Sequence, residues 1–147
     1  MSDAMEVFRD FLRVGLVDPA NRGGKWIFDN YPRKDFGKDP IISIIGADKK
    51  SKPMALGNTS WQSTTMIQVD IWVRDDVGYS INNEKVFDKD LCEKIADDLE
   101  EYVRKNWVSS GILLLELTDR TPLVFDLERV LWRIILTYEV VTIDYNY

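Results

Sequence analysis

The stretch TTMIQVDIWVRDD, residues 64–76, alternates between apolar and polar side chains. A β-strand places successive side chains on opposite faces of its sheet, so this alternation predicts a strand with one buried face. The predicted buried row is apolar and consists of Ile67, Val69, Ile71 and Val73. The opposite row consists of Gln68, Asp70, Trp72 and Arg74. The row that should face water therefore contains one large aromatic side chain, Trp72, which needs a cover.

A second strand is predicted just before this one. The run IISIIGA, residues 41–47, is rich in β-branched side chains, as buried strands are. The polar segment DKKSKPMALGNTS, residues 48–60, follows it, and we interpret this segment as a long hairpin connection. The connection carries three basic side chains, Lys49, Lys50 and Lys52. The two strands are therefore expected to pair antiparallel.

Two segments have apolar side chains at the three- and four-residue spacing of amphipathic helices. The first covers residues 4–16 and is expected to end near Gly15. The second lies within residues 84–107, with Asn82 or Asn83 as the candidate N-cap. These two segments predict one short N-terminal helix and one long helix.

Three further strands are expected. Residues 25–31 form a short candidate strand before Pro32, and residues 111–119 and 127–147 form two more, separated by a turn at 120–126. The last candidate is unusually long, because residues 130–145 would span about 50 Å at ~3.3 Å per residue. A strand of this length should bend or extend beyond its own domain.

The order of these elements predicts a two-layer α+β fold. We expect a mostly antiparallel sheet, with the N-terminal helix and the long amphipathic helix packed on one face. A chain of 147 residues is long enough for one domain with a substantial core. No change of composition divides it, so residues 1–147 are expected to form a single domain.

The sequence contains no histidine. This excludes serine–histidine and cysteine–histidine nucleophiles, and it excludes zinc sites that use histidine. We therefore expect no enzymatic activity, no metal site and no cofactor, although catalysis by lysine, tyrosine or carboxylates stays open. The single cysteine, Cys92, excludes an internal disulfide, fits a reducing compartment and is expected to be a partly buried structural thiol.

The formal net charge of −6 makes the chain a poor candidate for non-specific binding of duplex DNA. No apolar run approaches the roughly 20 residues that a membrane-spanning helix needs. The first residues lack a secretory signal, so we expect the intact start of a cytosolic product. Four acidic side chains should lie on the solvated face of the long helix: Asp97, Asp98, Glu100 and Glu101.

Two groups of residues are candidates for protein contacts. The three lysines either form a solvated hairpin tip or dock on an acidic surface of a neighbouring subunit. Trp72 is either an interface residue or a local platform for Arg74, whereas Trp132 is expected in the core. The candidate contact residues are thus Lys49, Lys50, Lys52, Gln68, Asp70, Trp72 and Arg74.

The chain resembles the tail-terminator, or tail-completion, proteins of long-tailed bacterial and archaeal viruses. The resemblance rests on IFDNYPRKDFGKDPIISIIGAD at residues 27–48, the lysine-rich loop, the strand at 64–76, the helix and two closing strands. Its most specific features are the Tyr31-Pro32 pair, the proline-led apolar strand at 40–45 and QVDIWV at 68–73. It covers nearly the whole chain and contains no catalytic signature.

The resemblance implies a virion protein, assembled in the host cytoplasm, that forms a homohexameric ring in the tail or neck. Such a ring caps the tail tube and joins it to the head-side connector. DNA passes through its lumen without specific binding, and six copies would carry a charge of about −36 that repels phosphates. The final strand could then pair across subunits, and Trp72 would face a neighbouring subunit.

Other interpretations stay open. The chain could be a head–tail connector or stopper protein of the same neck region. It could also be a non-viral module that binds a small ligand in an apolar pocket lined by aromatic side chains. A shared architecture does not by itself decide between these functions.

Overall fold

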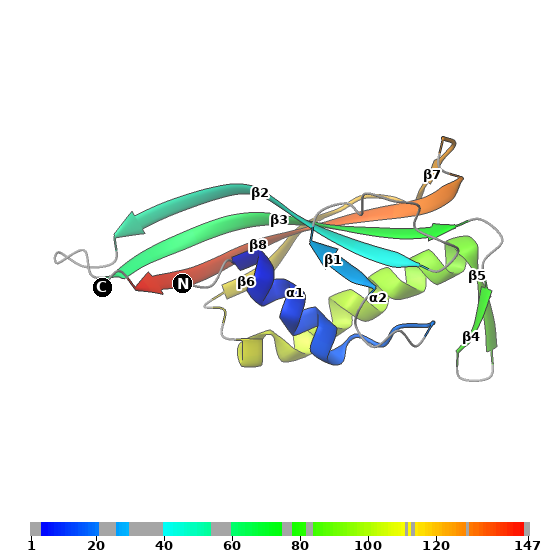
Figure 1. Ribbon diagram of the computed structural model, residues 1–147, viewed down its shortest axis with the longest axis horizontal. Helices are drawn as coiled ribbons and strands as arrows, with labels where there is room; N and C mark the ends of the chain where they lie inside the picture. Colours follow the sequence, from blue (N-terminus) through cyan, green and yellow to red (C-terminus); the bar gives the residue numbers. More distant parts are fainter. Residues whose placement is uncertain are drawn as a thin grey trace.

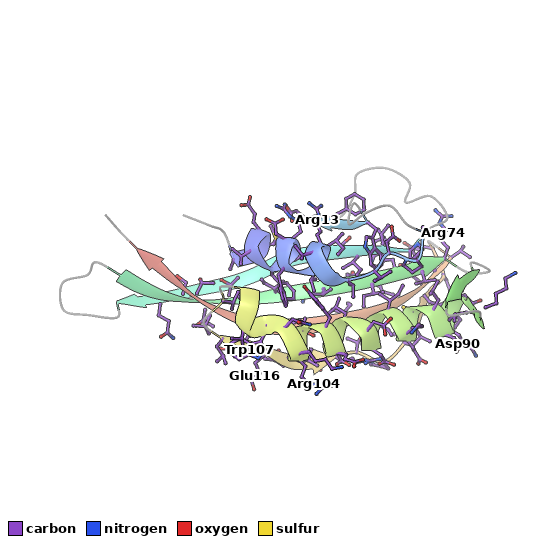
Figure 2. The ribbon with its side chains drawn as sticks, turned by 90° about the horizontal axis from the view of Figure 1, so that it is seen from below. Arg13, Arg74, Asp90, Arg104, Trp107 and Glu116 are labelled. Carbon is purple, nitrogen blue, oxygen red and sulfur yellow. The ribbon has the colours of Figure 1, made fainter. Side chains whose placement is uncertain are left out.

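The computed structural model describes residues 4–20, 26–29, 40–53, 60–74, 78–81, 84–110, 112, 114–128 and 130–145. A six-stranded sheet forms one layer of the molecule and two helices form the other (Figure 1). Both helices lie on the same side of the sheet (Figure 2). This architecture confirms the predicted two-layer α+β fold.

The elements follow one another in this order: α1 Ala4–Gly15, β1 Ile27–Asp29, β2 Ile41–Pro53, β3 Ser60–Arg74, β4 Gly78–Ile81, β5 Glu84–Phe87, α2 Asp88–Asn106, the 3-10 helix η1 Trp107–Ser110, β6 Leu114–Arg120, β7 Val124–Asp126 and β8 Leu131–Tyr145. The strand order in the large sheet is β1-β2-β3-β8-β6, and β7 pairs with β8 next to β6. Only the β1–β2 pair is parallel among the described pairs of this sheet. The pair β4–β5 forms a separate hairpin.

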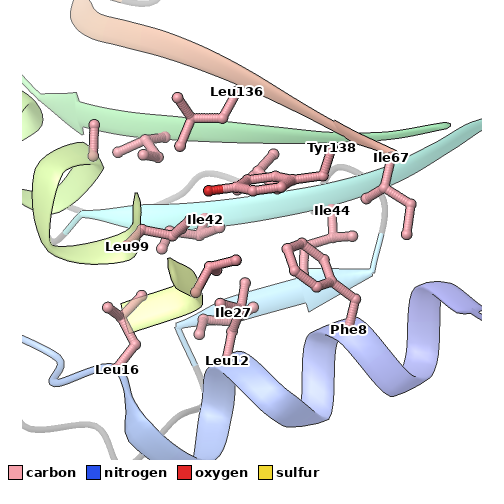
Figure 3. Close-up of a cluster of buried hydrophobic side chains, with 14 of the residues drawn as sticks. Phe8, Leu12, Leu16, Ile27, Ile42, Ile44, Ile67, Leu99, Leu136 and Tyr138 are labelled. Atoms are coloured by element: carbon pink, nitrogen blue, oxygen red, sulfur yellow. The ribbon is translucent and has the colours of Figure 1, made fainter. Parts of the chain in front are cut away.

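The alternation in β3 decides which face of the sheet is buried under the helices. Ile67, Val69, Ile71 and Val73 are fully buried in the main hydrophobic core, as predicted. They pack with apolar side chains of β2, β8, α1 and α2, including Ile42, Ile44, Leu136, Phe8 and Leu99 (Figure 3). The rings of Phe8 and Tyr138 contribute an aromatic contact between α1 and β8, with centroids 5.3 Å apart.

Polar contacts fix the position of α1 on the sheet and against α2. Arg13 donates hydrogen bonds to the backbone carbonyl of Ile27 in β1, one of them from Nε at 3.0 Å. The Tyr102 hydroxyl of α2 donates to the carbonyl of Phe11 at 2.7 Å, and the two rings stack with centroids 4.8 Å apart. These contacts satisfy polar groups that helix packing would otherwise bury without partners.

Three strands extend past the helical layer and form an arm, which is visible at the left of Figure 1. We define the arm as Gly46–Pro53 of β2, Ser60–Met66 of β3 and Glu139–Tyr145 of β8. A β-bulge between Gly46 and Asp48 lies where the β2 part of the arm begins. Bulges of this kind increase the local twist of a sheet. The long final strand, β8, forms part of this arm and extends beyond the helices.

Four sequence predictions need correction. Residues 48–53 and 60 belong to strands β2 and β3, so the predicted connection is too long, and residues 54–59 lie outside the described residues. The long helix begins at Asp88, because residues 84–87 form strand β5. The predicted turn at 120–126 contains the short strand β7. The last strand begins at Leu131, not at residue 127.

Candidate assembly surfaces

The polar row of β3 lies on the sheet face away from the helices. Asp70 is 1% exposed and Trp72 is 3% exposed within this single chain, whereas Gln68 and Arg74 are partly exposed. Trp72 packs in a small second cluster with Ile41, Leu131 and Phe28. The guanidinium of Arg133 lies over its ring, 5.4 Å from the centroid. The cover that Trp72 needs is therefore largely supplied by its own chain.

Asp70 and Arg133 form the main polar contact of this face. Arg133 Nε donates to both carboxylate oxygens of Asp70, at 2.8 and 3.0 Å, and its NH2 group donates to Asp70 Oδ2. Such a bidentate pair offsets the cost of burying the carboxylate. In this row, Gln68 and Arg74 keep accessible surface, and the Nε of Arg74 has no acceptor among the described residues. Contact of this row with a neighbouring subunit stays a prediction.

The three candidate lysines lie in the arm. The register pairs Lys49 with Thr65, Lys50 with Thr64 and Lys52 with Gln62. On its other side, β2 pairs with β1 at residues 42–44 only. No described strand covers the edge from Ile45 to Pro53. The structure thus separates the predicted residues into a buried cluster around Trp72 and an edge strand that carries lysines.

A groove of about 680 Å³ lies between α2 and β6, and the sequence analysis did not identify it. Figure 2 shows Trp107, Arg104 and Glu116 near the C-terminal end of α2. Its lining combines apolar and charged side chains: Val103, Trp107, Leu115, Leu117, Tyr138, Asp97, Glu100, Glu101, Glu116 and Arg104. The alternation Leu115, Glu116, Leu117 is the sequence signal for this groove, but it gives no indication that β6 is an edge strand.

The surface formed by α2 and β6 is acidic. Helix α2 contains seven acidic and four basic side chains, and β6 contains two acidic and one basic, which gives a net charge of −4. Arg120 of β6 offsets part of the negative charge of α2, because its guanidinium lies 2.8 Å from Asp97 and 2.7 Å from Glu100. Glu116 has no ion-pair partner among the described residues. It lies opposite Glu139 of β8, which also lacks one there.

Tyr138 forms part of the wall of the groove. The residue is 2% exposed, and Figure 3 shows its hydroxyl pointing toward α2. Among the described residues, no hydrogen bond of this hydroxyl is found. Burial raises the pKa of Tyr138, and the negative charge of Glu100 raises it further. A neutral hydroxyl is thus available in the groove wall.

The β7–β8 turn is an exposed apolar tip. Val124, Leu127 and Val130 are exposed, Leu127 at 82%. Val130 also has a φ of 55°, which is a strained conformation for a β-branched residue. The tip therefore presents three apolar side chains to solvent.

Several candidate chemical sites can now be placed. Among the described residues, no group of acidic or cysteine side chains is arranged to hold a metal ion. Asp97, Asp98 and Glu101 are exposed, as expected, and Glu100 is partly buried beside Arg120. Cys92 is fully buried, more than expected, and its thiol lies 3.7 Å from the carbonyl oxygen of Ile71. Within the described part of the chain, no helix is both long and apolar enough to span a membrane.

The chain is similar in fold to proteins of known structure. No family model and no curated protein matches the sequence. Several chains of solved structures match, and one of these matches covers 94% of this chain and 92% of the other, with a TM-score of 0.52 and 12% sequence identity. That structure is the virion of a native gene transfer agent (GTA) particle. The two chains share a fold.

Proposed function

We propose that this chain is a structural protein of a virus-like particle, with no enzymatic activity. It forms a ring, a hexamer in our proposal, that caps the tail tube and joins it to the head-side connector. The observation that carries this proposal is the shared fold with a chain of a GTA virion over nearly the full length of both proteins. The tail-terminator resemblance of the sequence points to the same class of particle.

The surfaces of the chain support assembly into a ring. A ring requires two different surfaces on each subunit that fit each other. Two sheet edges of different character have no neighbour among the described strands, the lysine-bearing edge of β2 and the acidic edge of β6. Its net charge of −6 per copy suits a lumen through which DNA passes without binding.

Deletion of the gene from the genome that encodes the particle tests this function. We expect filled heads that lack attached tails, together with tubes of uncontrolled length, because nothing would stop tube growth or join the two parts. Negative-stain electron microscopy of the lysate measures both features, and expression of the wild-type gene from a plasmid is the control. Tailed particles of normal length and connection in the deletion strain would contradict the proposal. Joined heads with over-long tubes would instead favour a different neck role.

A second candidate function is supported by the groove between α2 and β6. Its volume of about 680 Å³ lies within the range of small-ligand sites, and Trp107, Leu115 and Tyr138 provide apolar walls. A ligand-binding module would be a monomer or dimer, and native mass spectrometry would detect a retained small molecule. A ring without a bound ligand would exclude this candidate.

A further inference from the structure

We propose that the lysine-bearing edge of β2 in one copy pairs with the free edge of β6 in the next copy, so that the sheet continues from subunit to subunit. This inference rests on the ring assembly proposed above and names the two surfaces that would form it. Edge strands are the natural place for such pairing, because their outward backbone N–H and C=O groups have no partners within the sheet.

The edge of β6 has the properties of a surface that another chain covers. Leu114 is 44% exposed and Leu117 is 37% exposed on this strand. An exposed edge strand with apolar side chains favours aggregation unless a partner covers it. The register places Leu114 on the face away from the helices and Leu117 on the face toward them, so a strand added in the plane of the sheet would lie beside both leucines.

The charges on β6 and its neighbour β8 indicate a basic partner. Glu116 and Glu139 lie directly opposite each other, and like charges in such a pair are destabilising. Neither has an ion-pair partner among the described residues, so this repulsion is uncompensated within the described part of the chain. A strand with lysines beside Glu116 would remove it.

The β2 edge of the arm supplies such a strand. Residues 48–53 contain three lysines and one aspartate, a net charge of +2 in a chain whose net charge is −6. Asp48–Pro53 is extended backbone, and no described strand covers its outer edge. The arm also projects beyond the helices, so these residues can reach a neighbouring copy (Figure 1).

The registers of the two strands match the charges on each face. The register pairs Lys50 with Thr64 and Lys52 with Gln62, two positions of β3 on the sheet face away from the helices. Glu139 pairs with Met66 of β3 and with Glu116 of β6, so the register places both glutamates on that same face. A sheet that continues around a ring keeps its faces, so the two lysines would lie beside the two glutamates.

Charge reversal on both edges tests this pairing. Native mass spectrometry of the full chain would measure the fraction of protein in rings across a concentration series. We expect Lys50→Glu/Lys52→Glu and Glu116→Lys/Glu139→Lys each to raise the assembly midpoint by at least about tenfold. The variant that carries all four substitutions should assemble again at close to the wild-type midpoint, because the attraction between the two edges is restored with opposite signs.

Two controls separate a specific contact from a general charge effect. Lys85→Glu/Lys89→Glu makes the same change in net charge as the β2 variant at two exposed lysines near the start of α2. We expect rings at the wild-type midpoint from this variant. Circular dichroism of every variant establishes that it is folded. Mixing the Lys50→Glu/Lys52→Glu variant with the Glu116→Lys/Glu139→Lys variant should give rings that contain both, if the two edges meet.

The outcomes distinguish this inference from the proposed function. If wild type forms rings and both reversed variants form them equally well, the lysines only protect the edge of β2 and the inference is wrong, whereas the ring stands. If the variant with all four substitutions is folded but does not recover ring assembly, the two edges do not meet. A wild-type chain that stays monomeric at every concentration overturns both.

Discussion

Arg133 holds Asp70 in a bidentate ion pair on the sheet face that lies away from the helices. Its Nε lies 2.8 and 3.0 Å from the two carboxylate oxygens. The same guanidinium covers the ring of Trp72, so one side chain of β8 shields two adjacent polar-row positions of β3. This relationship explains how Asp70 and Trp72 become buried within one chain, although their row has the sequence pattern of a solvent-facing surface.

Removal of the Asp70 carboxylate should therefore destabilise the fold. Asp70→Ala is expected to lower the free energy of unfolding by about 2–3 kcal/mol, because it leaves the partly buried guanidinium without its partner. Urea unfolding followed by circular dichroism measures the loss. Asp98→Ala is the matched control, since it breaks only the exposed pair with Lys94 and should cost about 0.5 kcal/mol or less.

The role of Trp72 can be decided in the same way. Trp72→Ala should cost about 3–5 kcal/mol, because it empties a buried site among Ile41, Leu131 and Phe28. Gln68→Ala in the same row should cost under about 1 kcal/mol. A Trp72→Ala protein with wild-type stability that fails to assemble would instead support the contact role that the sequence suggested.

Gly15 ends α1 where no larger side chain fits. A Cβ at this position would overlap the ring of Tyr102, which is held by its hydrogen bond to Phe11 and cannot easily move. Gly15→Ala should therefore destabilise the protein by about 1–3 kcal/mol in thermal or urea unfolding. Gly46→Ala is the control, because its Cβ would meet only Met5 Sδ at an ordinary 3.8 Å. Equal stabilities of the two variants would show that α1 can shift away from α2.

Alkaline pH should destabilise the fold through its buried acids. Burial raises the pKa of the Cys92 thiol to about 12 from an ordinary value of 9.0, and burial also raises the pKa of Tyr102 and Tyr138. The unfolded chain therefore releases these protons at lower pH than the folded chain, so stability falls as pH rises from about 9 toward about 12.

Urea unfolding across this pH window checks the effect. Cys92→Ala loses packing at every pH, but its stability should fall less steeply with pH than that of wild type. A thiol reagent should modify Cys92 at the rate of unfolding, because the side chain is fully buried. Fast modification of the folded protein at neutral pH would argue against this burial.

The fold could be predicted because its strongest patterns are local. Alternation in residues 64–76 identified the central strand and its buried row, and helical spacing identified α1 and most of α2. The tight β4–β5 hairpin was missed because Val86 and Phe87 fit the apolar spacing of the helix that follows them. Residues 48–53 were taken for a loop because their sequence, DKKSKP, is polar and shows no alternation of apolar and polar side chains.

The candidate surfaces could be predicted only in part. The lysines were recognised as an unusual basic segment in an acidic chain, which depends on composition alone. The burial of Asp70 and Trp72 depends on Arg133, Leu131 and Ile41, and the sequence does not show which strands will be neighbours. The groove was missed for the same reason, since it forms only where the edge strand β6 lies beside α2.

Native mass spectrometry of the purified wild-type chain across a concentration series tests the central claim most directly. We expect a closed ring of six copies of the 17.1 kDa chain that becomes the dominant species as concentration rises. Negative-stain images of the same sample should show rings with an open centre. A chain that remains a monomer or a dimer at every concentration would contradict ring assembly.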